Sequence, residues 1–456
     1  MLHSAQLHHW RNLLVVLMVA ALASSTSLAR ERPPNIVFIL ADDLGWGDVG
    51  FNGRKSWSTP HLDKLAQQGT NFSRWYTAAV VCAPSRAALL TGRYGIHNGV
   101  TGNNDDLPRG EVTLAEALKP LGYHTALIGK WHHGRTRPGE TSYVHPMDQG
   151  FEEFYGYTDA RHAWEHFPRD LWHGRERKPV SGYAAKLLTD QAIDFVNRHR
   201  DRPFFLYLAH IIPHLYIQAP AEDVAAFKGK FAEKDADKPY NATYAAMITR
   251  LDAEIGRLLQ RLDELQLADR TLVVFTSDHG ATFEVGNQGA SNFHDSNQPF
   301  RGHKRNLWEG GVRVPAVVRW PGHVPAGKVS GDVVHMIDVF PTLLAAAGGK
   351  PQMEWQIDGV NLLGAWTGKE PAPDRTVFWE WRAEGYQQLA AMRNNLKLVQ
   401  TGNNRPELFD VVADPAERRP LNAEHPAMVQ QLQTELRAWL ATESPAAKET
   451  RQEVKP

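Results

Sequence analysis

The stretch that decides the fold runs from Asn35 to Gly45 and reads NIVFILADDLG. Six apolar residues follow Asn35 without alternating with polar ones, and two aspartates and then a glycine at position 45 come after the run. A strand that is apolar on both faces is typical of the centre of a parallel sheet, where helices cover both sides. The stretch therefore predicts a buried strand that carries two carboxylates at its carboxyl end.

The same arrangement, an apolar run followed by polar residues, recurs three times along the chain. The further predicted strands cover residues 124–128, 203–209 and 271–276. Helical patterns lie between the strands, over residues 59–69, with Thr59 as the expected N-cap, and over residues 112–121, 184–199 and 244–265. Alternating strands and helices predict an α/β sandwich with a mostly parallel sheet. Ligands bind at the carboxyl ends of such strands, so we expect the four polar clusters to converge on one site.

Near residue 345 the pattern changes to short strand-like segments and one amphipathic helix. The strand-like segments cover residues 376–381, 389–393 and 396–400, and the helix carries Met428, Leu432, Leu436 and Leu440. We therefore predict a catalytic domain over residues 30–345 and a small C-terminal α+β subdomain over residues 346–456.

The first 29 residues have the layout of a secretory signal peptide. Arg11 precedes an apolar run from Leu13 to Ala23, and small residues follow as far as Ala29. The run is too short to span a bilayer comfortably. We therefore predict an exported protein, periplasmic or secreted, without stable membrane insertion. The chain has 50 basic and 51 acidic residues. It therefore lacks the excess of basic residues that would indicate nucleic acid as a partner.

The chain contains one cysteine, Cys82, so no internal disulfide can form. Exported proteins normally use cysteines in pairs, and a lone thiol is either a buried apolar group or a reactive one. Composition alone favours the buried group. The surrounding stretch Cys82–Arg93, which reads CAPSRAALLTGR, favours the reactive one.

This stretch resembles the signature of the sulfatase family, Cys-x-Pro-Ser-Arg followed by Leu-Leu-Thr-Gly-Arg. The resemblance implies an alkaline-phosphatase-like fold and a maturation enzyme that converts Cys82 to formylglycine, with Arg86 holding the hydrated group. One hydroxyl of the hydrate attacks sulfur, and the second allows the resulting ester to collapse and expel sulfate.

Two pairs of residues at strand ends are candidate metal ligands. Asp42 and Asp43 follow one strand, and Asp278 and His279 follow another. Aspartates at such positions also serve as turn residues, but three carboxylates together suit a hard cation. The resemblance makes these four residues, with Cys82, the ligands of one Ca²⁺. Histidine at 279 replaces a frequent asparagine and leaves the identity of the ion open, because imidazole also suits softer ions.

Further motifs supply the candidate catalytic cations and proton carriers. By resemblance, Lys130 binds sulfate and His132 is the base that triggers sulfate release. His214 is the expected proton donor to the leaving oxygen, with His210 as the competing candidate. Lys304, within the second long match at residues 301–313, contacts sulfate and the leaving oxygen. With Arg86, these lysines form a positive cradle around the reacting group.

The resulting hypothesis is metal-dependent hydrolysis of sulfate esters, with sulfated carbohydrates as substrates. One alternative is a phosphodiesterase or phosphonate monoester hydrolase of the same superfamily, and another is a non-catalytic sugar-binding protein. The segment of residues 161–175 is rich in aromatic and basic side chains. It is either part of a site for sugar rings and their anionic substituents or an exposed loop of mixed composition.

Overall fold

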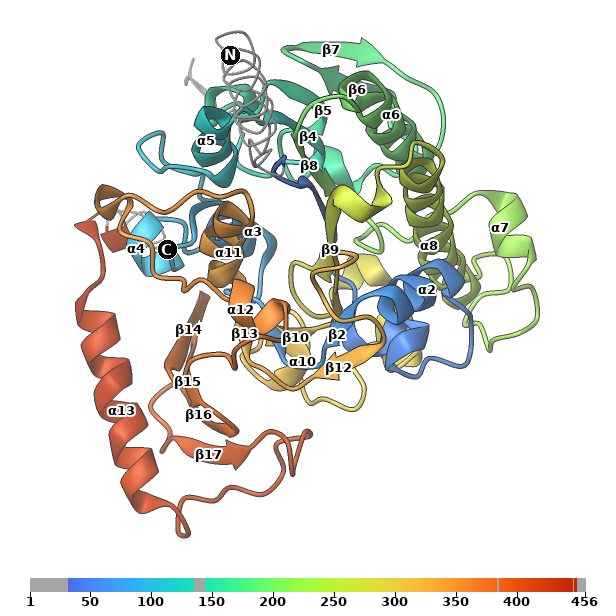
Figure 1. The fold of residues 1–456 in the computed structure, drawn as a ribbon. Helices are drawn as coiled ribbons and strands as arrows, with labels where there is room; N and C mark the ends of the chain where they lie inside the picture. The colour runs from blue at the N-terminus through green and yellow to red at the C-terminus, as the bar shows by residue number, and fades with distance from the viewer. Residues whose placement is uncertain (1–31, 135–143, 384, 446, 449–456) are drawn as a thin grey trace, which may run out of the picture. The chain divides into compact units, whose positions relative to one another are not determined.

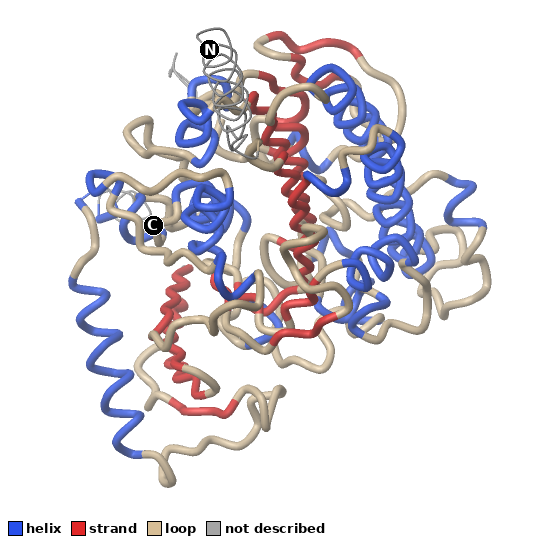
Figure 2. The backbone as a smooth tube through the Cα atoms, in the orientation of Figure 1, coloured by secondary structure: helices blue, strands red, loops and turns tan. Residues whose placement is uncertain are grey.

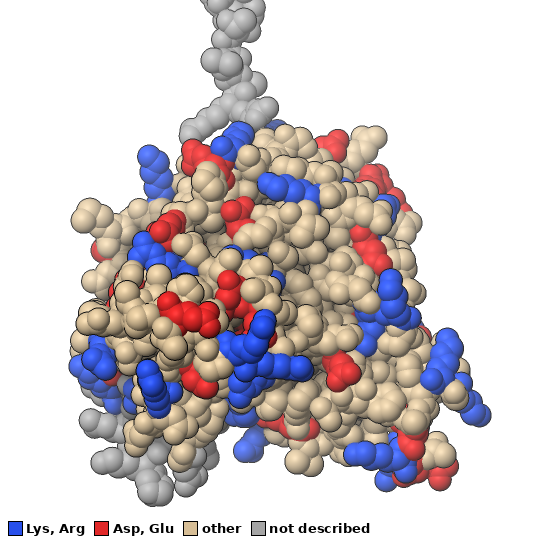
Figure 3. Space-filling view, turned by 90° about the horizontal axis from the view of Figure 1, so that it is seen from below, with Lys and Arg blue, Asp and Glu red and all other residues tan. Residues whose placement is uncertain are grey.

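The computed structural model describes residues 32–134, 144–383, 385–445 and 447–448. The predicted signal peptide, residues 1–29, lies outside them. No helix in these ranges combines the length and apolarity needed to cross a membrane. Acidic and basic side chains are interspersed on the face seen in Figure 3, in keeping with the formal net charge of -1.

A ten-stranded sheet in the order β12-β2-β11-β9-β1-β8-β4-β5-β6-β7 forms the centre of the molecule (Figure 1). Its parallel middle contains β9 (Thr271–Ser277), β1 (Asn35–Ala41), β8 (Phe204–Ala209), β4 (His124–Lys130) and β5 (Glu153–Tyr157). The outer strands are β12 (Lys328–Ser330), β2 (Thr70–Phe72), β11 (Ala316–Arg319), β6 (Asp170–His173) and β7 (Glu176–Pro179). The four predicted strands are thus confirmed, and they are adjacent in the sheet.

Strand β1 shows why its sequence is apolar throughout. All seven of its residues are buried. Ile36, Phe38 and Leu40 face one core cluster, whereas Val37 and Ile39 face the other. Because successive side chains of a strand point to opposite faces, a strand covered on both sides needs apolar residues at every position.

Helices cover both faces of the sheet (Figure 2). One core cluster includes residues of α2 (Pro60–Gln68), α6 (Ala184–His199) and α8 (Tyr240–Glu264). The opposite one includes residues of α3 (Cys82–Thr91), α5 (Leu114–Leu118) and α11 (Val339–Ala346). The other short helices are α4 (Gly95–Asn98), α7 (Ala221–Ala225), α9 (Ala290–Phe293), α10 (Glu309–Val312) and α12 (Leu363–Trp366).

The predicted helix ends need three corrections. Helix α8 begins at Tyr240, four residues before the predicted start at residue 244. The helix expected over residues 112–121 is α-helical only over Leu114–Leu118, and Lys119–Leu121 form a 3₁₀ turn in which Pro120 lacks an amide donor. Thr59 precedes α2 but makes no side-chain capping bond. Its hydroxyl instead accepts a hydrogen bond from the Gly50 amide (2.8 Å) and donates one to Asp63 (3.2 Å).

The C-terminal part forms an antiparallel sheet of β14 (Thr376–Ala383), β15 (Tyr386–Arg393), β16 (Leu396–Thr401) and β17 (Glu407–Asp410). Helix α13 (Pro426–Ala441) buries Leu432 and Leu436 beside this sheet. A third, small sheet joins β3 (Trp75–Tyr76), β10 (Arg313–Val314) and β13 (Val334–His335). The α/β class with a small C-terminal sheet is confirmed, whereas the boundary at residue 345 stays a prediction.

Candidate active site

The predicted site residues converge at the carboxyl ends of β9, β1, β8 and β4. Asp42 and Asp43 follow β1, and Asp278 and His279 follow β9, its parallel neighbour. The ends of these strands are joined by backbone hydrogen bonds. The Asp278 amide donates to the Ala41 carbonyl (3.2 Å), and the Asp42 amide donates to Ile212 beyond β8 (3.0 Å). These hydrogen bonds between the ends of adjacent strands therefore fix where the carboxylates lie.

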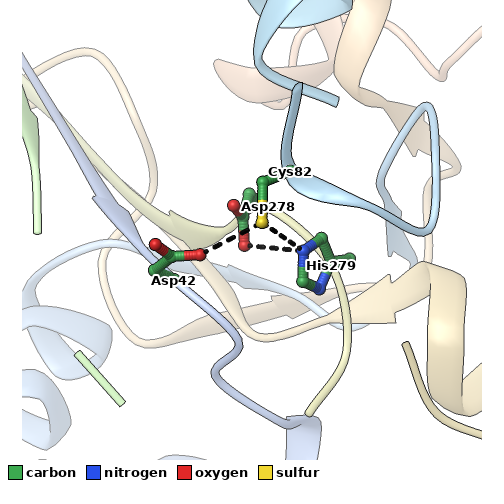
Figure 4. A group of neighbouring side chains, drawn as sticks. All are labelled: Asp42, Cys82, Asp278 and His279. Carbon is green, nitrogen blue, oxygen red and sulfur yellow. Dashed lines mark hydrogen bonds and ion pairs between the residues drawn. The ribbon is translucent and has the colours of Figure 1, made fainter. Parts of the chain in front are cut away.

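Cys82 is fully buried and is the first residue of α3. Its Sγ lies 3.3 Å from Nε2 of His279 and 3.5 Å from Oδ1 of Asp42 (Figure 4). Nδ1 of His279 lies 3.0 Å from the Gly280 carbonyl, to which it donates. A ring held in this way turns Nε2 toward residue 82 and the carboxylates, which is the orientation of a metal-ligating histidine.

The donor set around Cys82 fits a cation. Ligand atoms of Asp42, Cys82, Asp278 and His279 lie within 4.8 Å of one another. Burial and the charge of Asp42 raise the pKa of Asp278 to about 7. Burial would lower the pKa of His279, but the negative charges of Asp278 and Cys82 raise it to about 9. A buried set of acidic groups that raises its neighbours' pKa values in this way favours a positive ion among them.

Buried basic side chains pair with each of the three carboxylates. Arg86 donates to Oδ2 of Asp278 from Nε (3.1 Å) and Nη2 (2.9 Å). Lys130 donates from Nζ to Oδ2 of Asp42 (2.7 Å). Lys304 donates to Asp43 (3.0 and 3.1 Å). The geometry places Arg86 against Asp278 and the Lys130 carbonyl (3.0 Å).

A cavity of about 620 Å³ opens over this cluster, within the usual size range of small-molecule sites. Cys82, His132, His214 and Lys304 line it, whereas Arg86 and Lys130 do not. Burial, reinforced by the charge of Lys130, lowers the pKa of His132 to about 4. Its ring is therefore neutral near neutral pH and able to accept a proton.

His214 and His210 occupy different surroundings. His214 lines the cavity, and its Nε2 lies 3.5 Å from Nζ of Lys304 and 3.9 Å from Oδ2 of Asp43. His210 is buried, does not line the cavity, and has no hydrogen-bond partner for either ring nitrogen in the described part of the chain. Of the two candidate proton donors, His214 is therefore the one that faces the open space.

The segment of residues 161–175 divides into two parts. Arg161 and Trp164 line the cavity. The second half forms the β6–β7 hairpin at the edge of the sheet, and there Arg175 pairs with Asp148 (2.5 Å) outside the cavity. The second half is therefore a strand and its turn, with Arg175 exposed, and within residues 161–175 the cavity lining includes Arg161 and Trp164 of the first half.

Several cavity residues were missed by the sequence analysis because, apart from Arg305 in the match at residues 301–313, no motif contains them. They are Asn103 and Asn104 from the loop after α4, Glu284 and Arg305 around Lys304, and Trp381 and Arg382 from β14. Arg305 is adjacent to a motif lysine, which was the one available signal for it. The remaining residues reach the cavity only through the tertiary fold.

Two family models match the chain. One described as Sulfatase matches residues 34–349, and one described as N-sulphoglucosamine sulphohydrolase, C-terminal, matches residues 301–444. The chain belongs to the sulfatase family. The sulfatase is accordingly a sulfuric ester hydrolase, as its motifs predicted.

Relatives with known names cover most of this sulfatase. It is 31% identical to steryl-sulfatase of Mus musculus over 91% of its own length and 84% of the relative's. It is 35% identical to N-acetylgalactosamine-6-sulfatase of Canis lupus familiaris over 81% of its length and 72% of the relative's. The solved structure of Ps i-CgsB in complex with k-i-k-neocarrahexaose is 32% identical, covers 91% of this chain and 94% of that one, and superposes with a TM-score of 0.82.

Proposed function

We propose that this sulfatase removes sulfate groups from carbohydrates, with residue 82 as formylglycine and one divalent ion, calcium by family resemblance, beside it. The observation that carries the proposal is the position of Cys82. It lines a cavity, 3.3 Å from His279 and 3.5 Å from Asp42, at the start of a buried helix.

Asp42, Asp43, Asp278 and His279 would hold the ion together with residue 82. When bound, the ion supplies positive charge for the sulfate oxygens and offsets the repulsion among the carboxylates. Lys304 remains paired with Asp43 and extends this positive charge toward the cavity. Lys130 pairs with Asp42 and does not line the cavity.

Hydrated formylglycine supplies a nucleophilic hydroxyl and a second hydroxyl that permits release of sulfate. His214 donates a proton from Nε2 to the leaving oxygen, which a sugar alkoxide requires because it is a poor leaving group. Its Nδ1 donates to the Leu215 carbonyl (2.9 Å) and fixes the ring. Neutral His132 accepts the proton of the second hydroxyl.

Carbohydrate rather than steroid as substrate is supported by the cavity and by two relatives. Trp164, Trp381 and three arginines line the cavity, which suits polar rings with anionic groups better than a sterol. One named relative acts on N-acetylgalactosamine 6-sulfate, by its name, and one solved relative holds a neocarrahexaose. The predicted export of the protein belongs to the same proposal, and N-terminal sequencing of the mature chain tests it.

Two measurements test the proposal together. The peptide that contains residue 82 should be about 18 Da lighter than its thiol form, and Cys82→Ala should abolish turnover while the circular dichroism spectrum stays unchanged. Active enzyme is then assayed on sulfated galactose and galactosamine saccharides, an aryl sulfate, a steryl sulfate and a phosphodiester. Of these substrates, a saccharide should have the highest kcat/KM. Preference for the phosphodiester or the steryl sulfate would refute the substrate class.

A further inference from the structure

The three arginines of the cavity differ in how their charge is compensated. Arg305 pairs with Glu284, with Nη2 at 2.7 Å from Oε1, and Arg382 pairs with Glu380. Arg161 is exposed and has no carboxylate partner in the described part of the chain. Among the arginines lining the cavity, Arg161 therefore carries the guanidinium that is available to a ligand.

The loop that carries Arg161 is fastened to the segment that carries His214. The Tyr216 amide donates to the Trp164 carbonyl (3.4 Å), and the Trp164 amide donates to the Arg161 carbonyl (3.1 Å). Nε2 of buried His166 donates to the His214 carbonyl (3.0 Å). The backbone of Arg161 is thus held at a fixed position relative to the candidate proton donor.

The sulfate that is hydrolysed does not need Arg161. Lys304 and Cys82 both line the cavity, and Lys130 and Arg86 pair with Asp42 and Asp278 of the same cluster, so the reacting end already has its cations. A guanidinium presents a planar pair of donors that matches a sulfate or a carboxylate. Trp164, three residues further on, lines the cavity and packs edge-on against Tyr216, with ring centroids 5.8 Å apart, which leaves an aromatic surface near a bound sugar.

We propose that Arg161 binds a second anionic group of the saccharide, a sulfate or a carboxylate, other than the sulfate ester that is cleaved. This inference rests on the proposed carbohydrate substrate. It assigns the enzyme to saccharides that carry at least two negative groups, with Arg161 as the residue that selects them. The second group is bound and released unchanged, so the effect belongs to binding and not to the chemical step.

The test compares Arg161→Gln with the wild-type enzyme on matched saccharides. The set contains a monosulfated saccharide, the same saccharide with a second sulfate, the same with a carboxylate, and a small aryl sulfate. We expect KM for the two doubly charged saccharides to rise by about 10- to 100-fold, as loss of a charge-assisted hydrogen bond predicts, with kcat nearly unchanged. KM for the monosulfated saccharide and the aryl sulfate should stay the same, and Arg161→Lys should restore part of the loss.

Arg175→Gln is the matched control, since Arg175 lies in the same segment but outside the cavity and pairs with Asp148. It should leave all four substrates unaffected. A loss of equal size on mono- and doubly charged saccharides, or no loss on either, would overturn the proposal. A loss confined to the second sulfate or to the carboxylate identifies the anion that is bound. If the wild-type enzyme is inactive on every saccharide, the proposed function itself is refuted. If it hydrolyses saccharides but shows no preference for a second charge, only the role of Arg161 is overturned.

Discussion

Two buried clusters of charged side chains share the segment of residues 301–313, and only one of them has the features of a catalytic site. The catalytic cluster consists of Asp42, Asp43, Cys82, Arg86, Lys130, Asp278, His279 and Lys304. The second, here termed the structural cluster, consists of Tyr76, Glu309, Arg313, Lys397 and Glu417. Lys304 belongs to the first, and Glu309, five residues later, belongs to the second.

The structural cluster pairs its charges internally. Nζ of Lys397, on β16, lies 2.9 Å from Oε1 of Glu309 and 3.1 Å from Oε1 of Glu417. Arg313 and the Tyr76 hydroxyl contact Oε2 of Glu309 at 3.3 and 2.9 Å. None of these residues lines the cavity over Cys82, and the ion pairs join the C-terminal sheet to α10.

The comparison shows which features distinguish a candidate catalytic cluster from a buried cluster of ion pairs. In the structural cluster two carboxylates face two basic groups. In the catalytic cluster three carboxylates also pair with three basic groups, but ligand atoms of Asp42, Cys82, Asp278 and His279 lie within 4.8 Å of one another, and part of the cluster opens to a cavity. Perturbed pKa values occur in both clusters, so they do not by themselves identify an active site. A set of metal-ligand atoms grouped around one point, next to open space, is the distinguishing feature.

The largest expected effect comes from removing the proposed cation. Asp278→Asn or prolonged chelation should lower kcat/KM by about 100- to 1,000-fold, because stabilisation of developing charge is lost. Metal analysis of the purified variant should show less than one bound ion per chain. Glu309→Gln is the control from the structural cluster, and its metal content should equal that of the wild type. Fully active protein without bound metal would contradict this prediction.

Lys397→Met should instead reduce stability. It leaves two buried carboxylates with one fewer basic partner, which costs about 3–5 kcal/mol of unfolding free energy. Activity per folded molecule should stay within about twofold of wild type, because Lys397 does not line the cavity. Denaturant unfolding and active-site-normalised kcat measure the two effects. The double variant Lys397→Met/Glu417→Gln should recover part of the loss; a lowered kcat at unchanged stability would mean that the clusters are coupled.

The smallest expected effect is a pH dependence of the structural cluster. Burial raises the pKa of Glu417 to about 7, although Lys397 opposes the shift. The unfolded chain releases this proton near the ordinary glutamate value, so between that pH and about 7 the folded chain binds more protons than the unfolded one. Stability must therefore fall as pH rises through this window. The free energy of unfolding of wild type minus that of Glu417→Gln should drop by about 2 kcal/mol between about pH 5 and about pH 8; a constant difference would show that Glu417 stays ionised.

The parts of the fold and of the candidate site that could be predicted from the sequence are those determined by a local pattern or by a motif. Buried strands such as β1 are apolar at every position, so they are recognisable, whereas β3, β10 and β13 have two residues each and show no periodicity. The strand-end residues follow from sheet topology and from the family motifs. The structural cluster could not be predicted, because Lys397 and Glu309 lie 88 residues apart and each alone resembles an ordinary surface charge. The same holds for Arg382 at the cavity, which depends on where β14 packs.

The burial of α3 has a consequence for the order of events in making this enzyme. All ten residues from Cys82 to Thr91 are buried, and the thiol is 0% exposed. A second protein that reads Pro84 and Arg86 around the thiol cannot reach them in this helix. The proposed conversion must therefore finish while the segment is still extended, in competition with folding. Under the proposed function, a chain that folds first would keep its thiol and stay inactive until it unfolds, so slower folding would raise the yield of active enzyme.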